Sequence, residues 1–139
     1  MTMGYVLDDV TICELGRGDP VIANLVASLD AHDVRMSIPV LALAVAQHGL
    51  SNAQIEAVHG MFLHLTHTEP AVVSSTSDVL HLSAVSIHLG EPEDMAAAHA
   101  VAVSRYLDFP ILTPSPKRWE AARARLPWHV ELIEIADLG

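Results

Sequence analysis

The 139-residue sequence has one cysteine, few aromatic residues, few basic residues and no long apolar run. The lone Cys13 excludes an internal disulfide, and such sparing use of cysteine is typical of a reducing compartment. The longest apolar run, IPVLALAVA at residues 38–46, is far shorter than the roughly 20 residues that a membrane-spanning helix needs. The first residues show neither a basic segment nor an apolar core followed by a small-residue cleavage site. We therefore expect a cytoplasmic protein with no signal peptide and no membrane partner.

The scarcity of basic residues gives the chain a strongly acidic balance. Seven Lys and Arg residues against 17 Asp and Glu give a formal net charge of −10 with histidine neutral. A general nucleic-acid binder needs a basic surface that releases phosphate counterions, so this charge argues against that class. Four basic residues nevertheless lie close together near the end of the chain: Lys117, Arg118, Arg123 and Arg125. We interpret them as a solvated helix face and keep Lys117 and Arg118 as candidate contacts to a nucleic acid.

The chain has only two residues each of Trp, Tyr and Phe, so its core must consist mainly of Ala, Val, Leu and Ile. Its length indicates a single domain, residues 1–139, that is large enough to bury a sizeable core. We expect Tyr106 and Phe109 to pack in that core. We expect Trp119 and Trp128 to cover a sheet edge or to form a dimer contact.

Apolar runs typical of strands alternate with helical patterns along the chain. Strands are predicted at residues 5–7, 36–40, 71–75, 110–113 and 129–135. Helices are predicted at 11–17, 20–31, 39–48 and 51–65, from Ser77-Asp78, from Glu91-Pro92 to about Tyr106, and at 116–124. The clearest helix starts are Asp19-Pro20, an N-cap before a proline, and Ser51, which precedes an apolar stripe of Ile55, Val58, Phe62 and Leu65.

This alternation predicts an α/β fold in which helices cover both faces of a short, mostly parallel sheet. Ligands of such sheets bind beyond the carboxyl ends of the strands. The polar residues expected there are Asp8, Asp9, Ser74, Ser75, Thr113 and Ser115.

Five stretches carry a family resemblance that extends over the whole chain. YVLDDVTICELGRGDP (5–20) joins a strand, an aspartate and a helix that ends in an Arg-Gly-acid turn, and IPVLALAVAQ (38–47) joins a second strand to its helix. DMAAAHAVAVSRYLDFPILT (94–113) joins a late helix to a strand ending in Leu-Thr, and SPKRWEAARA (115–124) precedes HVELIEI (129–135). In this order they resemble the PIN domain, the three-layer α/β/α fold of VapC-type toxin ribonucleases. The Ala-Ala-His-Ala run at 97–100 is similar to that of actinobacterial PIN-like proteins.

The resemblance implies a cluster of three or four carboxylates that binds Mg²⁺ or Mn²⁺. Such ions activate water for attack on an RNA phosphodiester and stabilise the attacking and leaving oxygens. The resemblance also implies a homodimer and a partner protein, an antitoxin segment that binds across a groove.

Most of these carboxylates are missing when the family's acidic positions are carried over. Asp8 matches the first of them, whereas the others fall on Val45, Ala97 and Ser115. Asp94 lies three residues before Ala97, about 4.5 Å along a helix and on nearly the same face, so it is a candidate substitute. This pattern is that of a degenerate member of the family.

The candidate site follows from these matches. Its catalytic residues are Asp8 and Asp94, and its metal ligands are Asp8, Asp9 and Asp94. Asp9 joins them only if the chain has already turned after the strand, because side chains alternate along a strand. The candidate neighbours of the site are Thr11, His99, Thr113 and Ser115. With so few carboxylates, Mg²⁺ or Mn²⁺ would bind weakly.

Three other interpretations compete with a magnesium or manganese site on these aspartates. Asp8 is equally suited to cap the following helix by a bond to Thr11 or its backbone N–H. A response-regulator receiver also has an early acidic pair, but it needs a phosphate-accepting aspartate where this chain has Ser74 and Ser75. His59, His64, His67, His81 and His88 have helical spacings, yet a zinc site needs three or four convergent ligands, usually with Cys or acid partners, so we expect solvated or boundary histidines.

Two hypotheses about function follow. The first is a non-catalytic PIN-like module, a pseudoenzyme that binds a partner protein or nucleic acid. The alternative is a residual Mg²⁺- or Mn²⁺-dependent endoribonuclease, a VapC-like toxin of a toxin–antitoxin pair. The missing acids favour the first.

Overall fold

A computed structural model describes residues 3–90 and 93–138 of the chain. Within these residues the strands form one five-stranded, fully parallel sheet in the order β3-β2-β1-β4-β5. The strands are β1 (Gly4–Leu7), β2 (Arg35–Pro39), β3 (Thr68–Ala71), β4 (Ile111–Thr113) and β5 (Leu132–Glu134). Because β1 is the central strand, the residues that follow it lie at the middle of the carboxyl edge.

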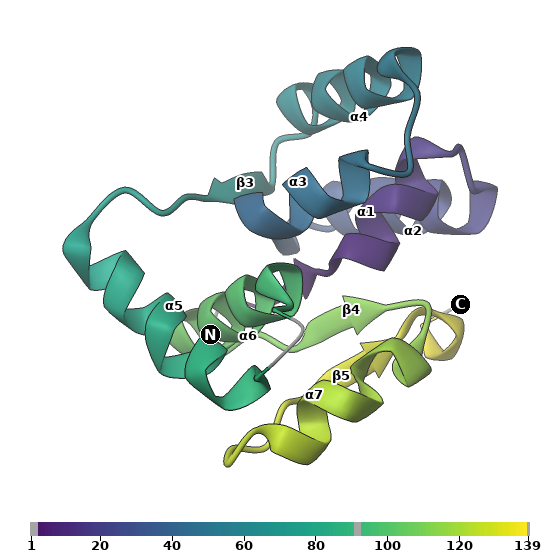
Figure 1. The fold of residues 1–139 in the computed structure, drawn as a ribbon. Coiled ribbons are helices and arrows are strands. Elements are labelled where there is room, and N and C mark those ends of the chain that lie inside the picture. The colour runs from purple at the N-terminus through teal and green to yellow at the C-terminus, as the bar shows by residue number, and fades with distance from the viewer. Residues whose placement is uncertain (1–2, 91–92, 139) are drawn as a thin grey trace.

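Helices cover both faces of this sheet (Figure 1). On one face lie α1 (Asp9–Gly16), α2 (Pro20–Ala31), α3 (Val40–Gln47) and α4 (Asn52–His64). On the other lie α5 (Thr76–Leu89), α6 (Met95–Leu107) and α7 (Glu120–Arg125), which a 3₁₀ turn, η1 (Pro116–Trp119), precedes. A second 3₁₀ turn, η2 (Ile135–Asp137), follows β5. The predicted three-layer α/β/α architecture is therefore confirmed.

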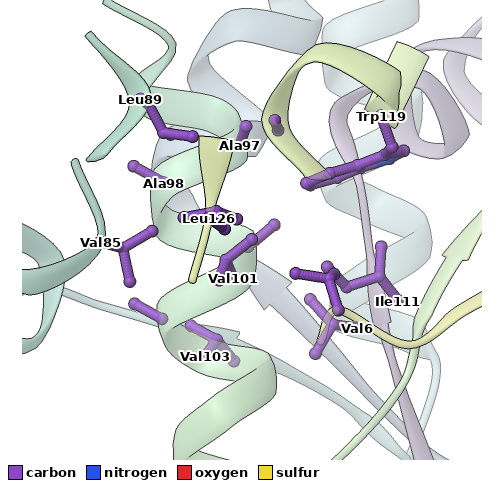
Figure 2. Packing of buried hydrophobic residues seen from close by; sticks show 14 of the residues in the cluster. Val6, Val85, Leu89, Ala97, Ala98, Val101, Val103, Ile111, Trp119 and Leu126 are labelled. Carbon is purple, nitrogen blue, oxygen red and sulfur yellow. The ribbon is translucent and has the colours of Figure 1, made fainter. Parts of the chain in front are cut away.

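Two hydrophobic cores form because neighbouring residues of a strand point to opposite faces. Val6 and Ile111 pack under α5, α6 and α7, whereas Leu7 and Leu112 pack under the first four helices. Figure 2 shows the first of these cores, in which small residues of α6 such as Ala97 allow close packing around Val101. Few aromatic residues are needed for such a core, as the composition predicted.

The helix starts with clear capping signals are confirmed. Asp19 accepts hydrogen bonds from Val21 N and Ile22 N, and Pro20 is the first residue of α2. Ser51 forms a capping box with Gln54 at the start of α4. The predicted start at Glu91-Pro92 lies outside the described residues, and α6 is capped by Asp94.

Several boundaries differ from the prediction. Strand β3 ends at Ala71 and contains Pro70, which an edge strand tolerates because one side of it has no ladder partner. The predicted strand 71–75 is therefore wrong: Ser75 caps α5 instead, so neither Ser74 nor Ser75 ends a strand. The final strand is also shorter than predicted, since only Leu132–Glu134 pairs with β4.

Tyr106 does not pack in the core as expected. Its side chain is 75% exposed, whereas Phe109 is buried as predicted. In the part of the chain that the structure describes, every helix is too short or too polar to span a bilayer.

Candidate functional site

Asp8 lies at the carboxyl end of the central strand and is fully buried. Its Oδ1 accepts a hydrogen bond of 2.8 Å from the backbone N–H of Thr11, so it is the N-cap of α1. Its Oδ2 accepts one of 2.9 Å from the indole Nε1 of Trp119. Thr11 is buried beside it and donates its hydroxyl to Leu112 O. The predicted capping role of Asp8 is confirmed.

Asp9 and Asp94 are joined by the guanidinium of Arg118. Arg118 donates to both oxygens of Asp9, from Nε at 3.0 Å and from Nη2 at 3.3 Å. It also donates to both oxygens of Asp94, from Nη1 at 2.7 Å and from Nη2 at 2.9 Å. We call these three residues the arginine clamp. Because Nη2 contacts both carboxylates, the clamp brings Asp9 and Asp94 together.

Local structure explains how the clamp assembles. The chain turns directly after β1, so Asp9 is already the first residue of α1. Its side chain therefore does not follow the alternation of the strand and can lie on the same side as the other acids. Asp94 caps α6 by accepting from Ala97 N at 3.0 Å. The turn η1 begins at Pro116, after β4, and carries both Arg118 and Trp119 to the acids.

The electrostatics of the cluster follow from burial and from the guanidinium. Burial raises the pKa of Asp8, although hydrogen bonds from Thr113, Thr11 and Trp119 act in the opposite direction. The hydrogen bonds of Arg118 lower the pKa of Asp94. Burial alone would lower the pKa of Arg118, but its bonds to Asp94 and Asp9 outweigh that effect and raise it. Arg118 is therefore a permanent cation held between Asp9 and Asp94.

This donor set does not fit a divalent ion as it is arranged. All six carboxylate oxygens of Asp8, Asp9 and Asp94 accept hydrogen bonds from N–H groups of the chain. A divalent ion on Asp9 or Asp94 would also lie next to the guanidinium of Arg118 and be repelled by it. Within residues 3–90 and 93–138, no group of three or more His, Cys, Asp or Glu side chains is arranged to hold a metal.

The positions without an acid have different surroundings. Val45 on α3 is 38% exposed, and Ala97 on α6 is completely buried. Thr113 is buried at the end of β4, and its hydroxyl accepts a 3.1 Å hydrogen bond from Ser115 N. Thr11, Thr113 and Ser115 are thus close to the acids or to residues that contact them.

His99 lies away from the acids. It is buried on α6, and its Nδ1 accepts from the backbone N–H of Leu41 at 3.2 Å. Its ring faces a pocket over β2 and β3, and it makes no hydrogen bond to Asp8, Asp9 or Asp94 in the part of the chain described. His67 contacts Asp30 and Asp33, at 3.3 Å from each, and forms no hydrogen bond or ion pair with Asp8, Asp9 or Asp94 in the described part of the chain.

Sequence reasoning missed the parts played by Arg118 and Trp119. Arg118 was expected on a solvated face or at a nucleic acid, yet its side chain is only 19% exposed. The sequence predicts Trp119 at a sheet edge or in a dimer contact, yet it is fully buried against Asp8. A weak signal existed, because the Pro-Lys-Arg-Trp turn follows the strand next to β1 and so lies at the same edge of the sheet.

Comparisons with protein-family models and with curated proteins find no match for this chain. Among solved structures, it is similar to a chain in the crystal structure of VapBC2 from Rickettsia felis bound to a DNA fragment from their promoter. The two share 19% sequence identity with a TM-score of 0.63, over 95% of this chain and 98% of that one. The fold is PIN-like. The similarity establishes the architecture of this PIN-like chain. What its site can do must be inferred from its own side chains.

Proposed function

We propose that this chain is a non-catalytic PIN-like module, a pseudoenzyme that binds a partner protein. The arginine clamp is the observation that carries the proposal. Its guanidinium supplies, from within the chain, the positive charge that the acidic cluster would otherwise take from a metal ion. Fixed in this way, Asp9 and Asp94 keep the turn η1 and the N-terminus of α6 in place instead of activating water.

A partner protein is favoured over nucleic acid on electrostatic grounds. The net charge of −10 opposes binding to phosphates. Of the two candidate nucleic-acid contacts, Arg118 is paired with two acids, and Lys117 is exposed. The similar VapBC2 chain belongs to an assembly with DNA, and we transfer from it only the idea of an antitoxin-like partner. We also propose a homodimer, which light scattering on the purified chain would test.

The alternative is a residual Mg²⁺- or Mn²⁺-dependent ribonuclease. It is supported by the gathering of three carboxylates, Asp8, Asp9 and Asp94, around one edge of the sheet. For this activity the clamp would have to open, because Arg118 occupies the oxygens that a metal needs.

A thermal-melt titration with Mn²⁺ and Mg²⁺ on the wild type and Asp8→Asn separates the two proposals. A site with a dissociation constant near 0.1 mM would add about 2.7 kcal/mol at 10 mM metal. For a pseudoenzyme, we expect equal and negligible metal effects on both proteins and no metal-dependent cleavage of RNA. A rise in Tm that Asp8→Asn abolishes, together with RNA cleavage, would overturn the proposal.

The partner is tested separately. A small antitoxin-like reading frame next to the gene would be coexpressed with this chain, and a stoichiometric complex is the expected result. Toxicity of the chain expressed alone would instead support the ribonuclease.

A further inference from the structure

A pocket of about 200 Å³ lies on the α5–α6 face of the sheet, over β2 and β3. Ser37 and His99 line its interior, and Asp78, His81 and Tyr106 come from the helices around it. His99 follows Asp94 by five residues, about 7.5 Å along the axis of α6, and Tyr106 lies farther still from the clamp. The pocket is thus separate from the acidic cluster.

Two polar side chains of this pocket each present one atom that has no hydrogen-bond partner among the described residues. His99 is 4% exposed and uses Nδ1 to accept from Leu41 N, which fixes the neutral ring with its proton on Nε2. Burial lowers the pKa of His99, so the ring stays neutral at physiological pH. Neither His99 Nε2 nor the hydroxyl of Ser37, a residue 6% exposed, has a hydrogen-bond partner in the described part of the chain. Both atoms border the pocket without a partner from the described chain, so a ligand in the pocket can hydrogen-bond to them.

The charges around the pocket disfavour an anion. Asp78 accepts from Ser74 N and Oγ through Oδ2, while Oδ1 has no hydrogen-bond donor among the residues described. The backbone N–H of Ser74 lowers the pKa of Asp78, which is therefore ionised. Arg35 is paired with Glu69 at 3.3 Å, so its charge is already balanced. A phosphate would meet repulsion from Asp78, and a cation would meet the Nε2–H of His99.

The mouth of the pocket presents aromatic rings. Tyr106 is 75% exposed, and its ring lies 5.7 Å from that of His81 with a tilt of 40°. Exposed aromatic side chains beside a polar pocket are a platform on which a planar ring can stack.

We propose that this pocket binds a neutral planar heterocycle of the 6-oxopurine class, a guanine base. Its carbonyl accepts from His99 Nε2–H and the Ser37 hydroxyl. Its ring N–H and exocyclic amine donate to Asp78 Oδ1, and its face stacks on Tyr106. The pocket volume of about 200 Å³ is smaller than the roughly 300–1,000 Å³ of pockets for drug-sized ligands. The proposed ligand is therefore a single base, with its sugar outside the pocket. This site goes beyond the proposed module and does not depend on the arginine clamp.

An NMR titration of the ¹⁵N-labelled full chain with guanosine and with adenosine tests the proposal. We expect saturable shifts with guanosine at residues around the pocket and weaker binding of adenosine, which lacks the carbonyl and the ring N–H. Absence of saturable guanosine binding overturns the proposal, and equal binding of adenosine overturns the assigned edge.

Two variants identify the pocket itself. Tyr106→Ala changes an exposed side chain, so the fold is retained, and loss of stacking should weaken guanosine binding about fivefold or more. Asp78→Asn should reduce the preference for guanosine over adenosine. Leu63→Ala, at an 88% exposed residue of α4 outside the pocket, is the control and should bind like the wild type. Unchanged affinity in Tyr106→Ala and Asp78→Asn would place the ligand elsewhere and overturn the proposal.

Discussion

Trp119 donates its indole N–H to the buried carboxylate of Asp8 at 2.9 Å, across 111 residues of sequence. The preceding residue, Arg118, engages Asp9 and Asp94. Two consecutive residues of one short turn thus satisfy all three aspartates at the carboxyl edge of the sheet. The turn η1 thus connects the C-terminal part of the chain to its N-terminal strand and helix.

Arg118→Ala should destabilise the fold by about 1–3 kcal/mol, because Asp9 and Asp94 would lose their shared cation. This expected loss of stability is smaller than that for a fully buried ion pair, because the side chain of Asp94 is 37% exposed. Urea denaturation at neutral pH measures the change. Arg17→Ala, which removes an exposed pair with Glu14, is the control and should cost less than about 0.5 kcal/mol. Equal losses in the two variants would show that the clamp does not stabilise the fold.

The same Arg118→Ala variant should gain affinity for Mn²⁺. Removing the guanidinium leaves oxygens of Asp9 and Asp94 free and unbalanced in charge. We expect a rise in Tm with added Mn²⁺ in Arg118→Ala that exceeds any rise in the wild type. An identical response of both proteins would mean that Arg118 does not keep metal out.

Asp8 should make stability fall as the pH rises from the acid range. Its pKa is raised by burial above the ordinary value of 3.8, so the folded chain holds a proton that the unfolded chain releases. The free energy of unfolding of the wild type, relative to Asp8→Asn, should therefore decrease from about pH 4 upward and level off above the raised pKa. Denaturation curves at a series of pH values measure this difference. A difference that increases with pH would mean that hydrogen bonds outweigh burial at Asp8.

His99 should act in the opposite direction. Burial lowers its pKa below the ordinary value of 6.5, so the unfolded chain takes up a proton before the folded chain does. The contribution of His99 to the free energy of unfolding is complete above pH 6.5. It is lost as the pH falls through and below that value. The advantage of the wild type over His99→Gln should shrink on acidification. His48→Gln, at an exposed position, controls for the loss of one histidine.

An acid introduced at position 97 should destabilise the fold. Ala97 is completely buried, so Ala97→Asp would place a carboxylate in a packed core and should cost about 2 kcal/mol or more. Val45→Glu, at a 38% exposed position, should change stability by less than about 0.5 kcal/mol. Calorimetric melts compare the two. If Ala97→Asp were as stable as the wild type, the core around α6 would accommodate a carboxylate.

Local signals in the sequence determined much of the fold. The caps at Asp19-Pro20 and Ser51, and the role of Asp8 at the start of α1, depend on hydrogen bonds that span two or three residues. Alternating strands and helices likewise follow from the spacing of apolar residues, which is why the layers were predicted correctly. The weakest local signals were misread, and β3 is the clearest case because its edge position tolerates Pro70.

Only the tertiary structure decided what the acids contact. Arg118 is separated from Asp9 by 109 residues, and no local pattern distinguishes an arginine on a solvated face from one that turns inward. Its position depends on the pairing of β1 with β4, which brings η1 to the carboxyl edge. The exposure of Tyr106 and the inward face of Trp119 also depend on how distant segments pack. The sequence by itself thus determined which acids were present, and long-range packing determined that an internal arginine pairs with two of them.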